Sequence, residues 1–109
     1  MTTSTPHGRT PPARIDDETG WRWAACLEQA CAFWWMVLWE PAGQHFTGYY
    51  RGPWKPGGVY RKGRTPEELW RLIVATQAEG RRIAEESAAP VVPPLLADEL
   101  PASLWRAAA

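Results

Sequence analysis

The chain has 109 residues and a formal net charge of zero at pH 7. It therefore has room for one small domain, and no global field draws it toward nucleic acid or an anionic membrane. The charges are unevenly distributed along the chain. Residues 41–66 contain five cations and no acid, whereas residues 65–109 carry more Asp and Glu than Arg. Such a bipolar molecule is suited to pairing with itself or with a partner of opposite sign.

The histidines and cysteines predict neither a metal nor a cofactor. Cys26 and Cys31 form no CxxC pair, and neither His7 nor His45 stands at a spacing that would complete a zinc site with them. We interpret both cysteines as small buried hydrophobic residues. Residues 1–20 lack the apolar stretch of a signal peptide, so we expect a cytoplasmic protein.

We expect the first third of the chain to consist of an N-terminal arm followed by an apolar segment. Residues 1–20 hold three Pro and six Thr or Ser without hydrophobic periodicity, which predicts a disordered arm. Residues 21–32 fit a short helix or a strand, and we favour the helix. A membrane segment is disfavoured because residues 23–39 are barely long enough and contain Glu28. A membrane-associated accessory protein of a plasmid or phage stays an alternative.

The octet FWWMVLWE, residues 33–40, opens a predicted antiparallel sheet. Its aromatic and branched residues favour a strand, and EPAGQ at residues 40–44 has the chemistry of a hairpin loop. Strand composition resumes at residues 45–51. GPWKPGG at residues 52–58 predicts a loop, and a short third strand follows at residues 59–62.

The residues after Gly63 predict a capped amphipathic helix. Thr65 is expected at the N-cap, Pro66 at the first helical position, and Glu68 completes a capping box. Apolar positions then recur at spacings of three and four, and the helix should end near Ser87. The apolar face consists of Leu69, Leu72, Ile73, Thr76, Gly80 and Ile83.

The C-terminal fifth of the chain contains a cluster of prolines. Residues 88–94 predict a semi-rigid linker that contributes little buried surface. Residues 95–109 predict either an unstructured tail or a docking peptide that folds back on the domain or binds elsewhere. The two alternatives stay open.

These elements predict an α+β fold at residues 33–87. We expect a small three-stranded antiparallel sheet with one C-terminal amphipathic helix on one face. Alternate residues of the octet point to opposite faces, and both sets are apolar. The face without the helix should be covered by residues 21–32, by a second copy or by another protein. The expected protein interface consists of Trp34, Trp35, Met36, Leu38 and Trp39.

The run from Trp34 to Thr76, with its helix start GRTPEELWRLI, resembles the partial RNase-H-like module of HicB-type antitoxins. In that family a short antiparallel sheet precedes a capped amphipathic helix. The run is also similar to small proteins of unassigned function in actinobacterial genomes and mobile elements. The resemblance implies an antitoxin-like regulatory role. HicB-type antitoxins usually add a DNA-binding element after the module, where this chain has a Pro-rich segment.

Catalytic chemistry is not predicted, and no small-molecule substrate is implied. Residues 20–96 contain no Asp, and every Ser lies outside or at the margin of the predicted fold. Cys31 and His45 could form a nucleophile and base on neighbouring strands, but a buried cysteine and a surface histidine explain them as well. We therefore expect a non-enzymatic interaction or regulatory protein that binds a protein partner or itself.

Nucleic-acid binding is the alternative function. Aromatic residues interleave with cations between residues 45 and 64, and such a surface can stack bases and neutralise phosphates. Five cations are few for duplex binding at physiological salt, and the acidic helix partly offsets them. The candidate residues are Tyr50, Arg51, Trp54, Lys55, Arg61, Lys62 and Arg64.

Overall fold

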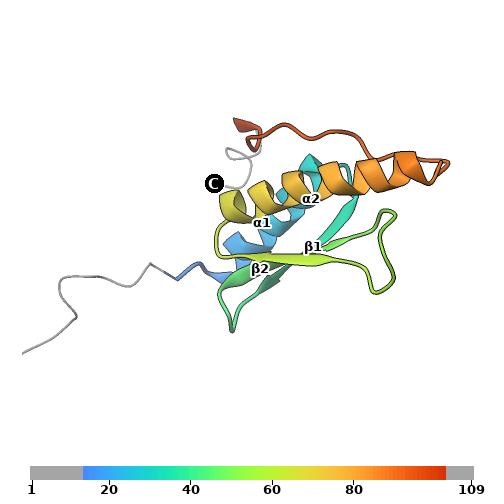
Figure 1. The fold of residues 1–109 in the computed structure, drawn as a ribbon. Coiled ribbons are helices and arrows are strands. Elements are labelled where there is room, and N and C mark those ends of the chain that lie inside the picture. The colour runs from blue at the N-terminus through green and yellow to red at the C-terminus, as the bar shows by residue number, and fades with distance from the viewer. Residues whose placement is uncertain (1–13, 103–109) are drawn as a thin grey trace, which may run out of the picture.

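The computed structural model describes residues 14–102 and arranges them as a helix, three strands and a second helix (Figure 1). Helix α1 spans Asp17–Ala30. Strands β1 (Trp35–Glu40), β2 (His45–Tyr50) and β3 (Tyr60–Gly63) pair antiparallel in the order β1-β2-β3. Helix α2 then spans Pro66–Glu86. The predicted α+β class, with a three-stranded antiparallel sheet and a C-terminal helix, is confirmed.

Helix α1 begins within the segment that was predicted to be an arm. The Asp16 side chain caps it by accepting a hydrogen bond from the Thr19 backbone N–H at 2.9 Å. The boundary of the arm at residue 20 is therefore wrong, and the ambiguity over residues 21–32 is resolved as helix up to Ala30. Residues 1–13, the rest of the predicted arm, lie outside the described residues.

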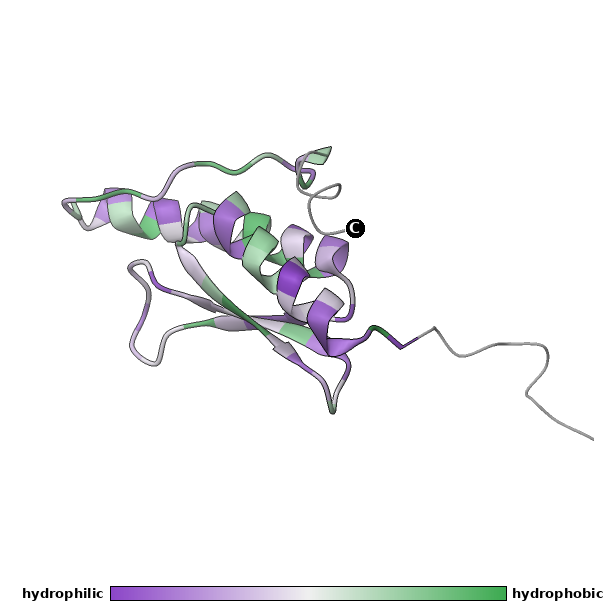
Figure 2. Ribbon diagram, turned by 180° about the vertical axis from the view of Figure 1, so that it is seen from behind, coloured by the Kyte–Doolittle hydropathy of each residue, from purple (hydrophilic) through white to green (hydrophobic). Residues whose placement is uncertain are grey.

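Both helices lie on the same face of the sheet (Figures 1 and 2). Helix α1 packs along β1, while α2 packs across β2 and β3. The Trp39 indole N–H donates to the Asp17 carboxylate of α1 at 3.1 Å, and the Trp35 indole N–H donates to the Gln77 side-chain oxygen of α2 at 2.9 Å. Residues 21–32 therefore add to the cover of the first face and leave the second face of the octet open.

Two helix glycines let aromatic rings of the sheet approach the helix backbones. A Cβ atom on Gly20 of α1 would overlap the Trp39 ring, and one on Gly80 of α2 would overlap the Tyr50 phenol. Glycine in a helix interior costs about 1 kcal/mol relative to alanine. That cost is offset here because the close approach buries two large rings against the helices.

The start of α2 has the predicted N-cap residue and the predicted proline, with a modified capping box. The Thr65 hydroxyl accepts from the Glu68 backbone N–H at 3.0 Å, and Pro66 occupies the first turn. The Glu68 carboxylate accepts from the Arg64 backbone N–H at 2.6 Å, one residue before the N-cap N–H that a capping box would pair. The Thr65 bond satisfies a backbone donor that a helix start leaves unpaired, and the Glu68 bond ties the preceding residue to the first turn. The helix ends at Glu86 and is capped by Ser87, as predicted.

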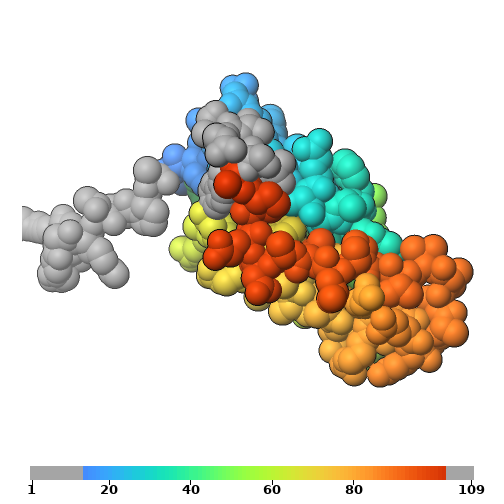
Figure 3. Space-filling model, turned by 90° about the horizontal axis from the view of Figure 1, so that it is seen from above, coloured from blue at the N-terminus to red at the C-terminus, as the bar shows by residue number. Residues whose placement is uncertain are grey.

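Residues 88–102 run back along α2, and we call them the C-terminal strap. Figure 3 shows the strap, in red and orange, lying over α2. Three side chains of α2 donate hydrogen bonds to its backbone carbonyls. They are Trp70 to Ala97 at 3.0 Å, Gln77 to Pro94 at 2.7 Å and Arg81 to Pro93 at 3.0 Å.

The strap corrects one expectation about the C-terminal fifth of the chain and decides between two alternatives for the rest. Pro93 is buried and side chains of α2 donate to the Pro93 and Pro94 carbonyls, so the expectation that residues 88–94 form only a linker is wrong. Leu100 joins the core cluster on the helical side of the molecule. The tail therefore docks as far as residue 102, on the helices and not on the open sheet face. Residues 103–109 lie outside the described residues.

Candidate protein-binding face

The sheet face opposite the helices is covered by no other element of the described chain (Figure 2). Alternate residues of the three strands point to it, because side chains alternate along a strand. We call it the outer face. It consists of Met36, Leu38 and Glu40 on β1, His45, Thr47 and Tyr49 on β2, and Tyr60 and Lys62 on β3.

One half of the outer face is apolar and exposed. The register sets Met36 beside Tyr49 and Tyr49 beside Tyr60, with Leu38 next along β1. Their exposed fractions are 37% for Met36, 44% for Leu38, 39% for Tyr49 and 55% for Tyr60. The two tyrosine rings lie 5.9 Å apart between centroids, within the range of stabilising aromatic pairs. A contiguous apolar surface on a small domain is typical of a protein interaction site.

The other half of the outer face is polar. The buried Thr47 hydroxyl donates to the Glu40 carboxylate, and the His45 Nε2 atom lies 3.2 Å from a Glu40 oxygen. The Thr47 hydrogen bond, then the charges of His45 and Lys62, lower the pKa of Glu40 below its usual value. An ionised carboxylate and the Lys62 ammonium thus border the apolar half and can orient a partner.

The turn from α1 into β1 holds an exposed aromatic residue in a strained conformation. Ala32 and Phe33 have φ angles of 52° and 63°, in the left-handed region. Bulky residues rarely adopt this region, and it costs about 1–2 kcal/mol per residue. The Phe33 side chain is exposed and stands two residues before β1. The Phe33 N–H donates to the Glu28 carbonyl at 2.8 Å, so the left-handed conformation ends α1 and leaves the ring exposed, where it can contact a partner.

Replacing Phe33 by glycine should raise the free energy of unfolding by about 0.5–1 kcal/mol, because glycine adopts positive φ without strain. The same change should weaken partner binding by removing the ring. Urea denaturation measures the first effect and a binding assay the second. Ala32→Gly is the control, since it relieves similar strain and keeps the phenylalanine. A less stable Phe33→Gly variant would show that the ring supports the fold.

The structure divides the predicted interface residues between two faces. Trp35 and Trp39 lie in the core beneath the helices, so their assignment to the interface is wrong. Trp34 is half-buried against the core, while Met36 and Leu38 are exposed as predicted.

Sequence reasoning missed the two exposed tyrosines, Tyr49 and Tyr60, as members of the apolar surface. It grouped the aromatic residues between positions 45 and 64 with the cations of the alternative nucleic-acid site. The strand register across from Met36 could have identified Tyr49, given the hairpin at residues 40–44. Tyr60 then follows as the next residue across the sheet.

The residues of the predicted nucleic-acid site do not share a surface. The Arg61 Nε–H donates to Thr76 of α2 at 3.0 Å on the helical side, while Lys62 projects on the outer face. Arg51 and Lys55 follow β2, whereas Arg64 follows β3 at the opposite end of the sheet. Dispersed cations give no continuous track for a phosphate backbone.

The aromatic residues of that predicted site pack inward. Tyr50 is buried against Gly80 of α2, and burial raises its pKa. Trp54 is half-buried and meets the Tyr50 ring edge-on, with centroids 5.9 Å apart and planes at 78°. Neither ring forms an open stacking platform, which single-stranded nucleic acid would need.

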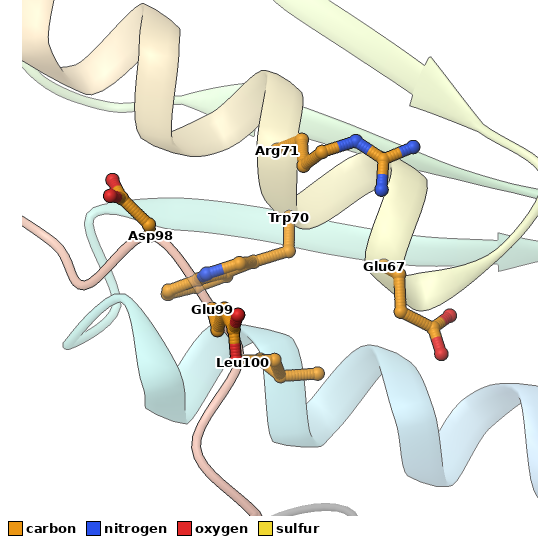
Figure 4. Close-up of a pocket in the computed structure, with 6 residues that line it drawn as sticks. All are labelled: Glu67, Trp70, Arg71, Asp98, Glu99 and Leu100. Carbon is orange, nitrogen blue, oxygen red and sulfur yellow. The ribbon is translucent and has the colours of Figure 1, made fainter.

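A cavity of about 340 Å³ lies between the start of α2 and the strap (Figure 4). The Trp70 ring and Leu100 form its floor, and its rim carries charged side chains. The carboxylates of Glu67 and Asp98 point away from each other and do not converge on one point (Figure 4). The lining residues are Glu67, Trp70, Arg71, Asp98, Glu99 and Leu100.

The candidate nucleophile and base lie far apart along the sheet. Cys31 is buried beside the start of β1, whereas His45 pairs with Glu40 at its end. Burial raises the pKa of the Cys31 thiol to about 11, so it stays protonated at neutral pH. Within residues 14–102, no three His, Cys, Asp or Glu side chains form a group that could hold a metal ion.

The stability of the protein should fall as the pH rises from about 9 to about 11. The Cys31 thiol ionises near its ordinary pKa in the unfolded chain but near pH 11 in the folded protein. Its contribution to the free energy of unfolding is therefore complete at a pH below the pKa of the unfolded state, and it is lost as the pH rises through the pKa of the folded state. The expected loss is on the order of 2 kcal/mol. Urea midpoints at several pH values measure it. Cys31→Ala is the comparison, and an equal alkaline loss in that variant would contradict the assignment to Cys31.

No helix in the described part of the chain has the length and apolar character needed to cross a bilayer. Comparison of the chain with protein-family models, curated proteins and solved structures finds no match.

Proposed function

We propose that this chain is a small non-enzymatic interaction protein that binds a protein partner through the apolar half of its outer face. The observation that supports the proposal is the exposed cluster of Met36, Leu38, Tyr49 and Tyr60 on a sheet face without internal cover. Burying such a cluster contributes roughly 25 cal/mol for each Å² removed from water. The neighbouring charges of Glu40 and Lys62 would fix the orientation of the partner.

We also propose, from the sequence, that the protein is a cytoplasmic, antitoxin-like regulator. A regulator of this kind acts by binding and needs no catalytic groups. The described domain offers one broad contact surface, and its cavity lacks converging reactive groups. A regulator that acts by occupying its partner needs only that surface.

Leu38→Glu should abolish partner binding without destabilising the domain. Leu38 is exposed, so the substitution should change the free energy of unfolding by no more than about 0.5 kcal/mol. It also sets a second carboxylate near Glu40, and burying that charge in an interface is costly. The measurement is quantitative capture of partners from an extract of source cells, followed by light scattering of the purified protein.

Leu95→Glu is the matched control, because Leu95 is 68% exposed and lies on the strap, on the helical side. The proposal expects that capture survives Leu95→Glu and is lost with Leu38→Glu. If light scattering shows a dimer that Leu38→Glu dissociates, the occupant is a second copy of the chain. Equal capture and equal oligomeric state for all three proteins would refute the outer face as a binding surface.

A further inference from the structure

The outer edge of β3 turns the backbone N–H groups of Tyr60 and Lys62 away from β2, while the outward carbonyl of Tyr60 accepts from the Arg61 side chain at 3.0 Å and keeps a second lone pair for a further donor. The Tyr50 N–H donates to the Val59 carbonyl at 3.2 Å just before β3 begins. Hydrogen-bonded and non-hydrogen-bonded pairs alternate along antiparallel strands, so Arg61 also bonds to β2, while Tyr60 and Lys62 turn their N–H and C=O groups outward. An edge of this kind can accept another strand.

The opposite edge of the sheet is closed. The same alternation turns the Val37 N–H of β1 away from β2, and it donates to the Glu28 carboxylate of α1 at 2.8 Å. Helix α1 packs against β1 and thus holds the Glu28 carboxylate at the middle of this edge. Within the described residues, the outward N–H groups of Tyr60 and Lys62 on β3 have no comparable side-chain acceptor, so the edge of β3 is the better site for strand addition.

A groove lies along the open edge, between β3 and α2. It has a volume of about 510 Å³ and is lined by Gly58, Val59, Tyr60, Arg61, Lys62 and Leu72. Leu72 provides an apolar wall from α2. The Arg61 guanidinium is held at the groove by Thr76 at 3.0 Å and by the Tyr60 carbonyl at 3.0 Å.

The positive charge of the β3 edge indicates which kind of strand it would bind. Strand β3 carries two cations, Arg61 and Lys62, and no acidic residue. A second copy pairing antiparallel with Tyr60 opposite Lys62 would set Arg61 directly against its own counterpart, and like charges across a pair are destabilising. An extended segment with acidic side chains would instead be attracted to the same edge.

We propose that β3 accepts an acidic extended segment of the partner protein as a fourth strand. This inference deepens the proposed function and rests on it. Main-chain hydrogen bonds to Tyr60 and Lys62 would provide the pairing. One set of alternating side chains would extend the outer face beside Tyr60, with a carboxylate near Lys62. The other set would face the groove, with an apolar side chain against Leu72.

The test uses the full chain and a capped peptide of alternating valine and glutamate, about ten residues long. Two matched peptides accompany it, one with N-methyl groups on alternate residues and one with lysine in place of glutamate. Amide chemical shifts measured by NMR should change at Tyr60 and Lys62 with the acidic peptide. The N-methylated peptide has the same charge but lacks the donors, so it should lose this effect. The lysine peptide should bind about tenfold more weakly or worse.

Two variants separate main-chain pairing from simple charge attraction. Lys62→Ala removes the charge and keeps the outward N–H, whereas Lys62→Pro removes both and is compatible with an edge position. The proposal expects that Lys62→Pro abolishes peptide binding and that Lys62→Ala only weakens it. Equal binding of the acidic and N-methylated peptides, equal effects of the two substitutions, or no shift at β3 would overturn strand addition.

The Leu38→Glu variant distinguishes failure of this inference from failure of the proposed function. Leu38 lies on β1, two strands from the edge, so the variant should bind the acidic peptide as the wild type does. Loss of partner capture with Leu38→Glu, together with no peptide binding at β3, would leave the outer face as the binding surface and overturn strand addition. Peptide binding at β3 with unchanged partner capture by Leu38→Glu would support strand addition and refute the outer face.

Discussion

Replacing Gln77 by leucine should lower the free energy of unfolding by about 1–3 kcal/mol. Gln77 is buried in α2 and links the sheet to the strap. Its side-chain oxygen accepts from the Trp35 indole at 2.9 Å, and its nitrogen donates to the Pro94 carbonyl at 2.7 Å. Leucine fills a similar volume but leaves the buried Trp35 indole N–H without an acceptor, which costs about 1–3 kcal/mol, whereas the part-buried Pro94 carbonyl loses only its bond to α2. Urea denaturation at pH 7 measures the loss.

The two partners of Gln77 also determine the orientation of its amide. An indole N–H can only donate and the Pro94 carbonyl can only accept, so the amide has one favourable orientation. Gln77→Glu should therefore destabilise the protein as well, because an ionised oxygen would face the Pro94 carbonyl in a buried site.

Gln29→Leu is the control, since Gln29 is an exposed residue of α1. It should change the stability by no more than about 0.5 kcal/mol. A Gln77→Leu variant as stable as the wild type would show that the strap and the sheet are not linked through this residue.

The elements that the sequence predicted well are those that local chemistry determines. Thr65, Pro66 and Glu68 lie within four residues of one another and determine where α2 begins. The Pro and Gly of residues 40–44 likewise place the hairpin between β1 and β2. Such signals need no knowledge of distant residues.

The predicted interface was partly wrong because it depends on distant partners. Strand alternation separates Trp35 and Trp39 from Met36 and Leu38, but alternation alone does not tell which set faces the helices. In the structure, Asp17 and Gln77 accept hydrogen bonds from the indoles of Trp39 and Trp35 and thereby fix these two residues on the helical face. Tyrosines 49 and 60 needed the strand register, which joins three segments of the chain.

The strap was predicted as a linker because proline-rich composition usually indicates one. Its packing depends on Trp70, Gln77 and Arg81, which are spaced by seven and four residues and so share one face of α2. The sequence contains the residues of this second, polar and aromatic face of α2. It does not identify their partners in the strap, because these are backbone carbonyls, which every residue has.

Leu100→Asp should lower the free energy of unfolding by about 2–4 kcal/mol and release the strap from α2. Leu100 is buried between α1 and Trp70 (Figure 4), so a carboxylate there would lose its hydration without gaining a partner. Release would expose the Trp70 indole, which now donates to Ala97 at 3.0 Å. Urea denaturation measures the stability, and tryptophan fluorescence should shift to longer wavelength as the indole meets water.

Leu95→Asp makes the same chemical change at an exposed position of the strap. It should leave both the unfolding midpoint and the emission wavelength close to those of the wild type, because the carboxylate stays in water. A Leu100→Asp variant that matches Leu95→Asp in both measurements would contradict docking of the strap. Since Leu100 lies on the helical side, release of the strap should leave binding of the acidic peptide at β3 unchanged. Measuring both stability and peptide binding of Leu100→Asp therefore separates residues that support the core from residues that form the binding surfaces of the sheet.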